Sequence, residues 1–532
     1  MIFMDKRTRM KAGLSLLLFF CTLIGQAQID VQHYRYEIEL NDQSDGIAGK
    51  AFVTIKFQSD ASQVKLNLAS LEGEKGMMAY QVLEQGQRLT SSHKENILLF
   101  QLPNPAKAGE VRTFEIGYMG TPKDGLIIST NQHGDRTFFA DNWPNRAHNW
   151  IPCNDNPADK ASVEFIVTAP AHYKVISNGL LVEEKAIDAS RTRTHWKEET
   201  SIPTKVMVIG AARFAVARVD SAYRVPVTAW VYPQDSAKGV YDYALADDIL
   251  SYMESYVAPY PYKKLANVQS KTIFGGMENA NAIFYAENTV TGNRKSEALV
   301  AHEIAHQWFG NTATEKSFAH LWLSEGFATY FTNLYMEHKY GADSFRKRLA
   351  EERNEVIQFA RVSNRPVVDS TSDYMDLLNA NSYQKGAWVL HMLRRTIGDE
   401  GFQKSVQAYY NQYKHSNADT RDFQRVVEET TGTKLDTFFH QWLYQPGVPK
   451  LEVRWRNKSS KVVEFNVQQR SKLLYQLPLE IGVVYKDGTQ EVKMFNISRA
   501  AEAFEVSVKE KPVKLVLDPN TNLLFEGKIT EQ

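Results

Sequence analysis

The chain has 532 residues, enough for about three domains at roughly 150 residues each. Hydrophobic residues make up 43% and charged residues 23%, a balance that is typical of globular proteins and excludes a fibrous or disordered chain. Lysine plus arginine and aspartate plus glutamate each total 62, so no basic excess indicates nucleic acid as a partner.

Residues 1–27 have the pattern of a cleaved signal peptide. Four basic residues precede an apolar run at 14–24, and small residues follow this run. The run is too short to span a bilayer. Lipid attachment at Cys21 is the less favoured alternative, because large side chains precede it. We therefore expect an exported protein, periplasmic or secreted, with no stable membrane span. The mature chain would hold 58 basic and 61 acidic residues and one cysteine, Cys153, which excludes an intrachain disulfide.

Apolar and polar residues alternate in the next part of the chain, for example at 52–57 and 163–167. This pattern predicts an N-terminal antiparallel β domain over residues 28–225. Further on, apolar residues recur every three to four positions, which predicts helices. The segments with this spacing are 241–256, 296–309, 323–340, 385–396 and 402–413. We therefore expect a mainly helical domain over residues 226–446.

The helical pattern stops at Pro446 and Gly447, and alternation then returns. The alternating segments are 451–455, 462–467, 479–485 and 492–497. Asp487 and Gly488 lie between the last two segments, as in a hairpin turn. The pattern predicts a small C-terminal β-sandwich over residues 447–532.

Metal-binding residue types occur in the helical middle of the chain. His302, Glu303 and His306 form a His-Glu-x-x-His motif. Positions four apart share one face of a helix, so both imidazoles can reach one ion while Glu303 addresses a water on it. Glu325 follows His306 by nineteen residues, at the start of the next predicted helix, and can supply a third ligand. Two histidines and one carboxylate are typical of a catalytic zinc site, so we expect one Zn²⁺ per chain.

A glycine pair precedes this motif in Gly275-Gly276-Met277-Glu278-Asn279. Alone, the segment is as consistent with a simple turn in which Glu278 is solvated as with a site where the backbone approaches a ligand. Together with the metal motif, the chain resembles the aminopeptidase N-like zinc metallopeptidases, the gluzincins with Gly-x-Met-Glu-Asn before His-Glu-x-x-His, eighteen residues and Glu. Similar segments at 151–160, 307–311 and 382–386 extend the resemblance over about residues 30 to 445.

The resemblance implies a thermolysin-like catalytic domain and a role for each residue of the motif. His302, His306 and Glu325 would bind zinc, and Glu303 would act as general base. Tyr383, in the segment 382–386, would donate a hydrogen bond to the oxyanion of the tetrahedral intermediate.

The resemblance also implies the residues that bind the substrate. Glu278 would bind the α-ammonium group, Met277 would line the pocket for the first side chain, and the backbone of Gly276 would pair with the peptide. Relatives place a second polar residue beside the amine, and here Asp141 is the expected residue.

The predicted function is a zinc aminopeptidase acting on peptides with a free N-terminus. A related hydrolase of the leukotriene-hydrolase type, an endopeptidase and a catalytically silent peptide-binding protein remain alternatives. Glu278 disfavours the endopeptidase, since an ammonium-binding carboxylate selects chain ends. The sequence gives no prediction of oligomeric state.

Overall fold

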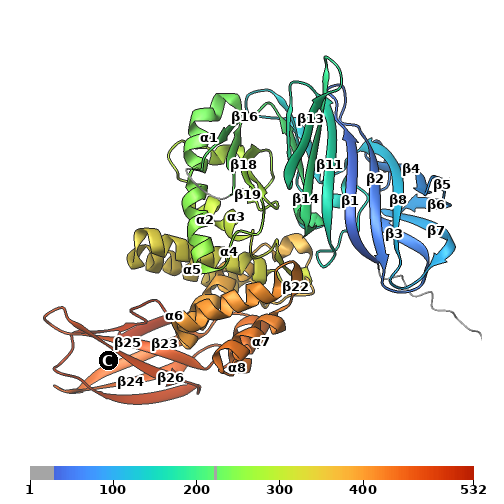
Figure 1. Cartoon of the computed structure of the whole chain (residues 1–532). Helices are drawn as coiled ribbons and strands as arrows, with labels where there is room; N and C mark the ends of the chain where they lie inside the picture. The colour runs from blue at the N-terminus through green and yellow to red at the C-terminus, as the bar shows by residue number, and fades with distance from the viewer. Residues whose placement is uncertain (1–28, 221–224) are drawn as a thin grey trace, which may run out of the picture.

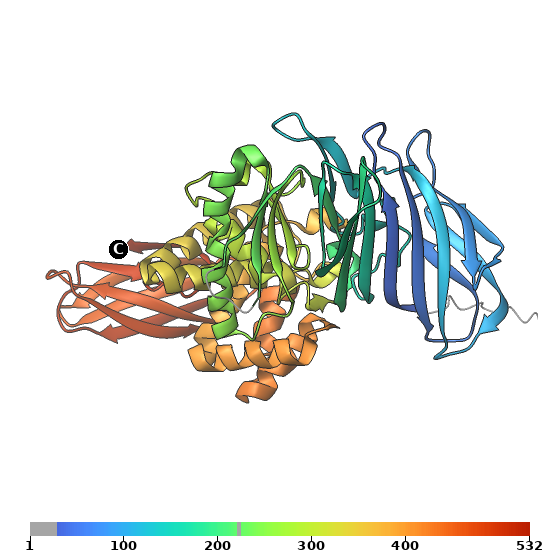
Figure 2. The same cartoon turned by 45° about the horizontal axis from the view of Figure 1, so that its top comes forward.

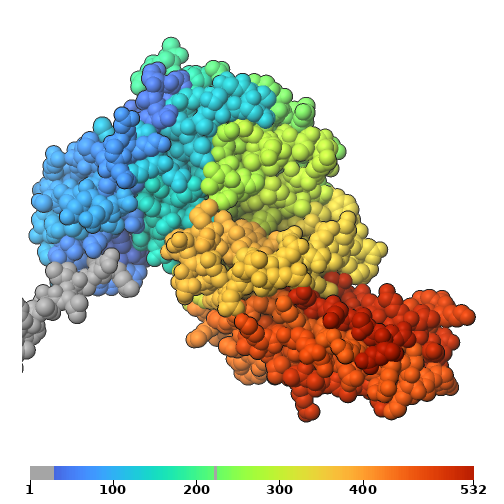
Figure 3. All heavy atoms as spheres, turned by 180° about the vertical axis from the view of Figure 1, so that it is seen from behind, coloured from blue at the N-terminus to red at the C-terminus, as the bar shows by residue number. Residues whose placement is uncertain are grey.

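A computed structural model describes residues 29–220 and 225–532. The predicted signal peptide, residues 1–27, lies outside the described residues. Figures 1 and 2 show three parts in chain order: N-terminal sheets, a helix-rich centre and C-terminal strands. From behind, the centre again lies between the other two parts (Figure 3). The chain is thus multidomain, with an N-terminal β-rich domain and a helical central domain.

The N-terminal part contains fifteen of the strands. They are β1 (Ile29–Glu39), β2 (Ile47–Phe57), β3 (Ala61–Asn67), β4 (Gly76–Glu84), β5 (Gln87–Arg88), β6 (Ser91–Lys94), β7 (Ile97–Ala106), β8 (Val111–Thr121), β9 (Leu126–Thr130), β10 (Arg136–Ala140), β11 (Lys160–Pro170), β12 (Lys174–Ser177), β13 (Leu180–Ala186), β14 (Arg191–Pro203) and β15 (Ile209–Ala212). They form an eight-stranded sheet, β13-β14-β11-β1-β2-β8-β4-β5, a four-stranded sheet, β12-β15-β10-β9, and a three-stranded sheet, β3-β7-β6.

The alternation predicted for this part is confirmed, since Val53, Ile55 and Phe57 are fully buried on one face of β2. The expectation of a wholly antiparallel domain is wrong at one place, where β1 runs parallel to β11. The two strands are far apart in sequence, so no hairpin fixes their relative direction.

The central part also contains a five-stranded mixed sheet that sequence periodicity did not predict. Its strands are β16 (Ala215–Arg218), β17 (Val227–Val231), β18 (Leu265–Ser270), β19 (Gly276–Met277) and β20 (Ala282–Ala286), in the order β16-β17-β18-β20-β19. Strands of two to six residues are too short for a clear alternation. The short strand β19 forms one edge of this sheet and pairs antiparallel with β20.

The helices are α1 (Ser236–Tyr243), α2 (Leu245–Tyr256), α3 (Glu297–Ala305), α4 (Trp322–Tyr340), α5 (Ala342–Val362), α6 (Gly386–Tyr413), α7 (Thr420–Thr431) and α8 (Asp436–Phe439), with π-helical turns η7 (Asn381–Lys385) and η8 (His440–Tyr444). Short 3₁₀ segments are Ala147–Asn149, Thr204–Val206, Pro233–Asp235, Glu287–Thr289, Phe318–His320 and Tyr374–Leu377, and β21 (Ala313–Glu315) pairs with β22 (Ser416–Ala418). The predicted helices 385–396 and 402–413 are confirmed as the two halves of α6, which the non-helical backbone of Gly398, with a φ of 78°, separates. In residues 29–220 and 225–532, no helix has the length and apolar character needed to cross a membrane.

The C-terminal strands are β23 (Lys450–Ser459), β24 (Val462–Gln469), β25 (Leu477–Val484), β26 (Gln490–Ile497), β27 (Ala501–Ser507), β28 (Lys514–Leu517) and β29 (Glu526–Glu531). They form the sheets β27-β24-β23-β29 and β26-β25-β28. The predicted turn at Asp487 and Gly488 is confirmed, because β25 and β26 pair antiparallel across it. Phe465 of β24 and Phe495 of β26 lie 4.9 Å apart between ring centroids, so the two sheets contact each other through apolar side chains.

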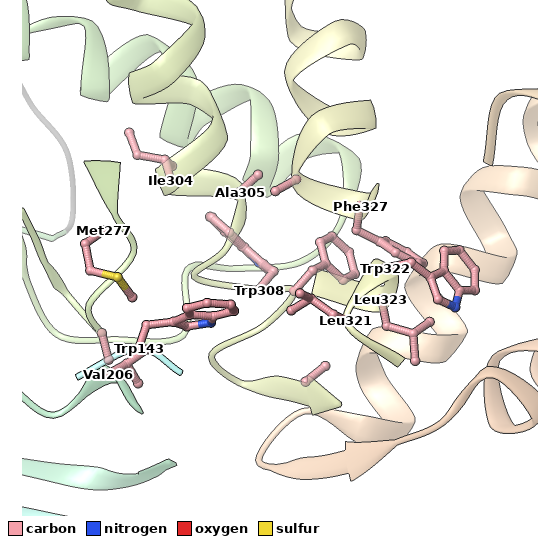
Figure 4. Close-up of a cluster of buried hydrophobic side chains, with 14 of the residues drawn as sticks. Trp143, Val206, Met277, Ile304, Ala305, Trp308, Leu321, Trp322, Leu323 and Phe327 are labelled. Carbon is pink, nitrogen blue, oxygen red and sulfur yellow. The ribbon is translucent and has the colours of Figure 1, made fainter. Parts of the chain in front are cut away.

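A buried apolar cluster fixes α3 and α4 relative to each other. Trp308, just after α3, and Trp322, at the start of α4, are fully buried, and Figure 4 shows them in the same cluster as Phe327. Close packing of this kind tolerates little displacement. Side chains on the opposite faces of α3 and α4 are therefore held in a fixed geometry.

Two lysines join the N-terminal part to the centre. Lys160 Nζ donates to the backbone oxygens of Thr312 and Ser416, at 2.6 and 2.9 Å. Lys205 Nζ lies 2.5 Å from Glu315 Oε1, and both side chains are almost fully buried. Since breaking a buried ion pair by removing one partner costs about 3 to 5 kcal/mol, these contacts hold the two parts in one arrangement.

Candidate active site

A pocket of about 490 Å³ lies where β19, α3, α4 and α5 meet. His302, Glu303 and His306 line it from α3 and its C-terminal end, and Glu325 lines it from α4. Glu278 and Tyr383 complete its polar wall. The structure thus brings the predicted metal motif, catalytic tyrosine and ammonium-binding residue into one cavity.

Three side-chain atoms converge at the base of the pocket. The Nε2 atoms of His302 and His306 are 3.1 Å apart, and each lies 3.3 Å from Glu325 Oε2. One ion can contact three atoms in this arrangement. Two imidazole nitrogens and one carboxylate oxygen are a donor set that suits Zn²⁺ and leaves a position for water. The side chains of this site fit the metal that the sequence predicts.

Contacts at Nδ1, the ring nitrogen that faces away from the metal site, fix the orientation of His306. Its Nδ1 lies 3.0 Å from the backbone oxygen of Phe309 and 3.1 Å from Ser324 Oγ. If Nδ1 donates its hydrogen to the Phe309 carbonyl, the lone pair on Nε2 points at the ion. Gly310 makes this turn possible with a φ of 116°, and a Cβ there would lie 2.3 Å from Ser324 Oγ. A backbone carbonyl therefore orients this imidazole.

Glu303 is buried and packs tightly against β19. A Cβ built on Gly276 would lie 2.4 Å from Glu303 Oε1, so a larger residue there would displace this carboxylate. Burial raises the pKa of Glu303 well above its ordinary value, the charge of His306 opposes the rise, and Glu278 reinforces it. A carboxylate in this environment readily accepts and holds a proton, as a general base must.

Glu278 has an unpaired carboxylate oxygen in the pocket. The residue is 5% exposed, and Oε1 has no hydrogen-bond partner in the described part of the chain. Gln307 Nε2 and Asn311 Nδ2 donate to the Glu278 backbone oxygen, at 2.9 and 2.6 Å, and fix the residue in place. An unpaired buried acceptor costs free energy that a cationic ligand would recover.

Tyr383 lies in the π-helical turn η7 and faces the metal-binding residues. Its ring stacks on His302, with ring centroids 5.9 Å apart and an interplanar angle of 15°. Gly326 and Gly386 allow α4 and α6 to approach closely, since a Cβ built on Gly326 would lie 2.9 Å from the Gly386 Cα. Burial raises the pKa of the Tyr383 phenol well above its ordinary value, and Glu325 reinforces the rise. The hydroxyl therefore stays protonated and can donate a hydrogen bond.

Of the remaining predicted residues, Met277 lines the pocket but Asp141 does not. Asp141 Oδ1 accepts from Arg146 Nη2 at 2.5 Å, and Oδ2 accepts from Thr272 Oγ1 and the Ile273 backbone N–H at 2.9 and 3.0 Å. Both oxygens already accept hydrogen bonds and Asp141 does not line the pocket, so the geometry gives no support to the expectation that Asp141 contacts the substrate amine, which stays a prediction. Asp141 anchors the loop that leads into β19.

The structure also adds pocket residues that sequence reasoning missed. Trp143, two positions after Asp141, lines the pocket and packs edge-on against Phe274, with ring centroids 5.9 Å apart. From α5 the lining residues are Arg348, Glu351, Glu352 and Glu355. Their spacing places them on one face of the helix. A prediction of α5 from the sequence would therefore have grouped these four side chains.

Two parts of the chain match domain models of one peptidase family. Residues 241–442 match the Peptidase family M1 domain, and residues 30–206 match the Peptidase M1 N-terminal domain. An M1 zinc metallopeptidase from Deinococcus radiodurans has the same fold, with a TM-score of 0.69 and 22% identity over 79% of this chain and 94% of that chain.

Among curated relatives, aminopeptidase M1-A of Oryza sativa subsp. japonica is 28% identical over 80% of this chain and 51% of its own length. Glutamyl aminopeptidase of Homo sapiens is 29% identical, over 70% of this chain and 40% of its own length. Leucyl aminopeptidase of Saccharolobus solfataricus is 25% identical, over 93% of this chain and 65% of its own length. The matches therefore span 40 to 65% of the length of these relatives. Since both M1 domain types match in chain order and the fold agrees, the chain belongs to peptidase family M1.

Proposed function

We propose that the chain is a zinc-dependent aminopeptidase that removes the N-terminal residue from peptides. The observation that carries this proposal is the unpaired Glu278 Oε1 in the same pocket as the three converging metal-binding side chains. His302, His306 and Glu325 would hold Zn²⁺. The bound ion would polarise the scissile carbonyl and lower the pKa of the attacking water.

Glu278 positions the substrate by its N-terminus. Its carboxylate pairs with the α-ammonium group, so the first peptide bond, and no later one, reaches the catalytic groups. Gly276 lies on the edge strand β19, whose outer side can pair with the peptide backbone. Met277 contacts the first side chain, because it lines the pocket beside Glu278.

Glu303 then transfers the proton, and Tyr383 stabilises the negative charge that develops on the carbonyl oxygen. The Glu303 carboxylate takes the proton from the attacking water and delivers it to the nitrogen of the leaving amine. The Tyr383 hydroxyl donates a hydrogen bond to the oxygen that becomes negative as the carbonyl is attacked.

We also propose the arrangement of the whole chain: export through residues 1–27, followed by domains at 28–225, 226–446 and 447–532. Apolar contact between the two C-terminal sheets supports a β-sandwich in the last of these. Sequencing the N-terminus of the protein from fractionated cells tests export. A mature chain beginning near Gln28 is expected, and an intact Met1 in the cytoplasm contradicts it.

Turnover of leucyl-aminocoumarin by the purified mature chain tests the metal-dependent activity. We expect about one zinc per chain by elemental analysis, loss of turnover with a chelator and recovery when zinc is added back. A folded protein that holds zinc and turns over no aminoacyl-coumarin would contradict the proposal.

A further inference from the structure

One cationic side chain lies among the carboxylates of the pocket. The acidic lining residues are Glu278, Glu303, Glu325, Glu351, Glu352 and Glu355. Arg348 of α5 is the sole lysine or arginine among the described residues of this lining. A cation in a pocket with this many acids would be expected to form an ion pair with one of them.

Arg348 forms no ion pair at contact distance with a described residue, although its charge acts on Glu352 from farther away. Its Nε donates to Asn333 Oδ1 at 2.6 Å, and no carboxylate oxygen of the described chain lies within 4.0 Å of its nitrogens. The carboxylate that could compete, that of Glu352, is held by Asn333 Nδ2 at 2.9 and 3.0 Å from its two oxygens. Asn333 thus fixes the guanidinium through one nitrogen and leaves its two terminal NH₂ groups free.

A guanidinium with two free NH₂ groups matches a carboxylate, which it can bind through two parallel hydrogen bonds. Glu351 and Glu355 are exposed, so water screens their charges. Arg348 and Glu278 therefore give the pocket one site for an anion and one for a cation. A short peptide carries that pair of charges at its two ends.

We propose that Arg348 binds a carboxylate on the part of the substrate that follows the scissile bond. This inference rests on the proposed aminopeptidase function and specifies its substrate class. The carboxylate is either the C-terminus of a di- or tripeptide or an acidic side chain next to the scissile bond. Arg348 is thus a specificity-determining residue that favours short or acidic peptides.

Three substrates with the same N-terminal residue distinguish the two sources. Leu-Ala has a C-terminal carboxylate, Leu-Asp-amide has a side-chain carboxylate, and Leu-Ala-amide has neither. We expect the wild-type kcat/KM for at least one acidic substrate to exceed that for Leu-Ala-amide by about 10- to 100-fold, mainly through KM. In Arg348→Gln this ratio should fall to about one, and in Arg348→Lys part of it should remain.

Arg346→Gln is the matched control, because Arg346 lies one half-turn away on α5, is exposed and pairs with Asp343 at the surface. This variant should keep the wild-type ratio. A wild-type ratio near one, or a ratio that survives in Arg348→Gln, overturns the proposal. An equal loss on all three substrates in Arg348→Gln also overturns it, since that result assigns Arg348 a structural role. A failure of the aminopeptidase function itself looks different, because the wild-type protein would then cleave none of the three.

Discussion

Replacing Gly276 by alanine tests the contact between the edge strand and the proposed general base. The added Cβ would lie 2.4 Å from Glu303 Oε1 and 2.6 Å from its Cδ. Nonbonded heavy atoms are at their optimum near 3.5 Å, so the carboxylate must move by about 1 Å. A displacement of that size at a catalytic group costs about 10²-fold in rate. We expect kcat for leucyl-aminocoumarin to fall by about this factor while the zinc content stays the same.

Gly275→Ala is the matched control, because it adds the same methyl group one position earlier. There the new Cβ would meet only the Leu299 methyl carbons, at 3.8 and 3.9 Å, which is ordinary contact distance. Its kcat should stay within about twofold of wild type, since such contacts carry no strain. Wild-type kcat in Gly276→Ala, or an equal loss in both variants, would show that this contact does not position Glu303.

Three further variants separate proton transfer, oxyanion stabilisation and metal binding. Glu303→Gln should retain zinc while kcat falls by about 10² to 10⁴, and full activity would exclude a general base here. Tyr383→Phe keeps the ring that stacks on His302 and should lower kcat by about 10² to 10³ with little change in KM. An effect confined to KM would assign Tyr383 to substrate binding instead. Glu325→Ala should lose zinc during dialysis, and an unchanged metal content by elemental analysis would show that Glu325 is not a ligand.

Periodicity predicted the long elements of the fold and missed the short or charged ones. The helix containing His302 and the one containing Glu325 were predicted because their apolar residues recur at helical spacing. The five-stranded sheet was missed since each strand has too few residues to show alternation. Helix α5 was missed because four of its 21 residues are buried and the rest carry mostly charged or polar groups. Burial of one narrow apolar face fixes the position of α5 in the fold. So few apolar residues give only a weak helical pattern in the sequence.

The residues of the active site likewise divide into those with a local sequence pattern and those placed by long-range contacts. Helical spacing brought His302 and His306 together, because the motif lies on one helix. The place of Glu325 followed from the resemblance to the family's motif, since Glu325 lies on the next helix, α4, and reaches the site through packing between helices. The position of Asp141 could not be predicted in this way. Its carboxylate is taken by a neighbouring arginine and by a loop more than a hundred residues later in the chain. Long-range contacts of this kind have no local signature in the sequence.

If Glu278 selects a free N-terminus, the protein must distinguish a peptide from its N-acetylated form. A peptide and its N-acetylated form are incubated with the wild-type protein, and the cleavage products are identified by mass spectrometry. Acetylation removes the positive charge that the unpaired Glu278 oxygen would bind. We predict removal of the N-terminal residue from the free peptide and no cleavage of the acetylated one. Comparable cleavage of both peptides would contradict the aminopeptidase assignment and favour an endopeptidase.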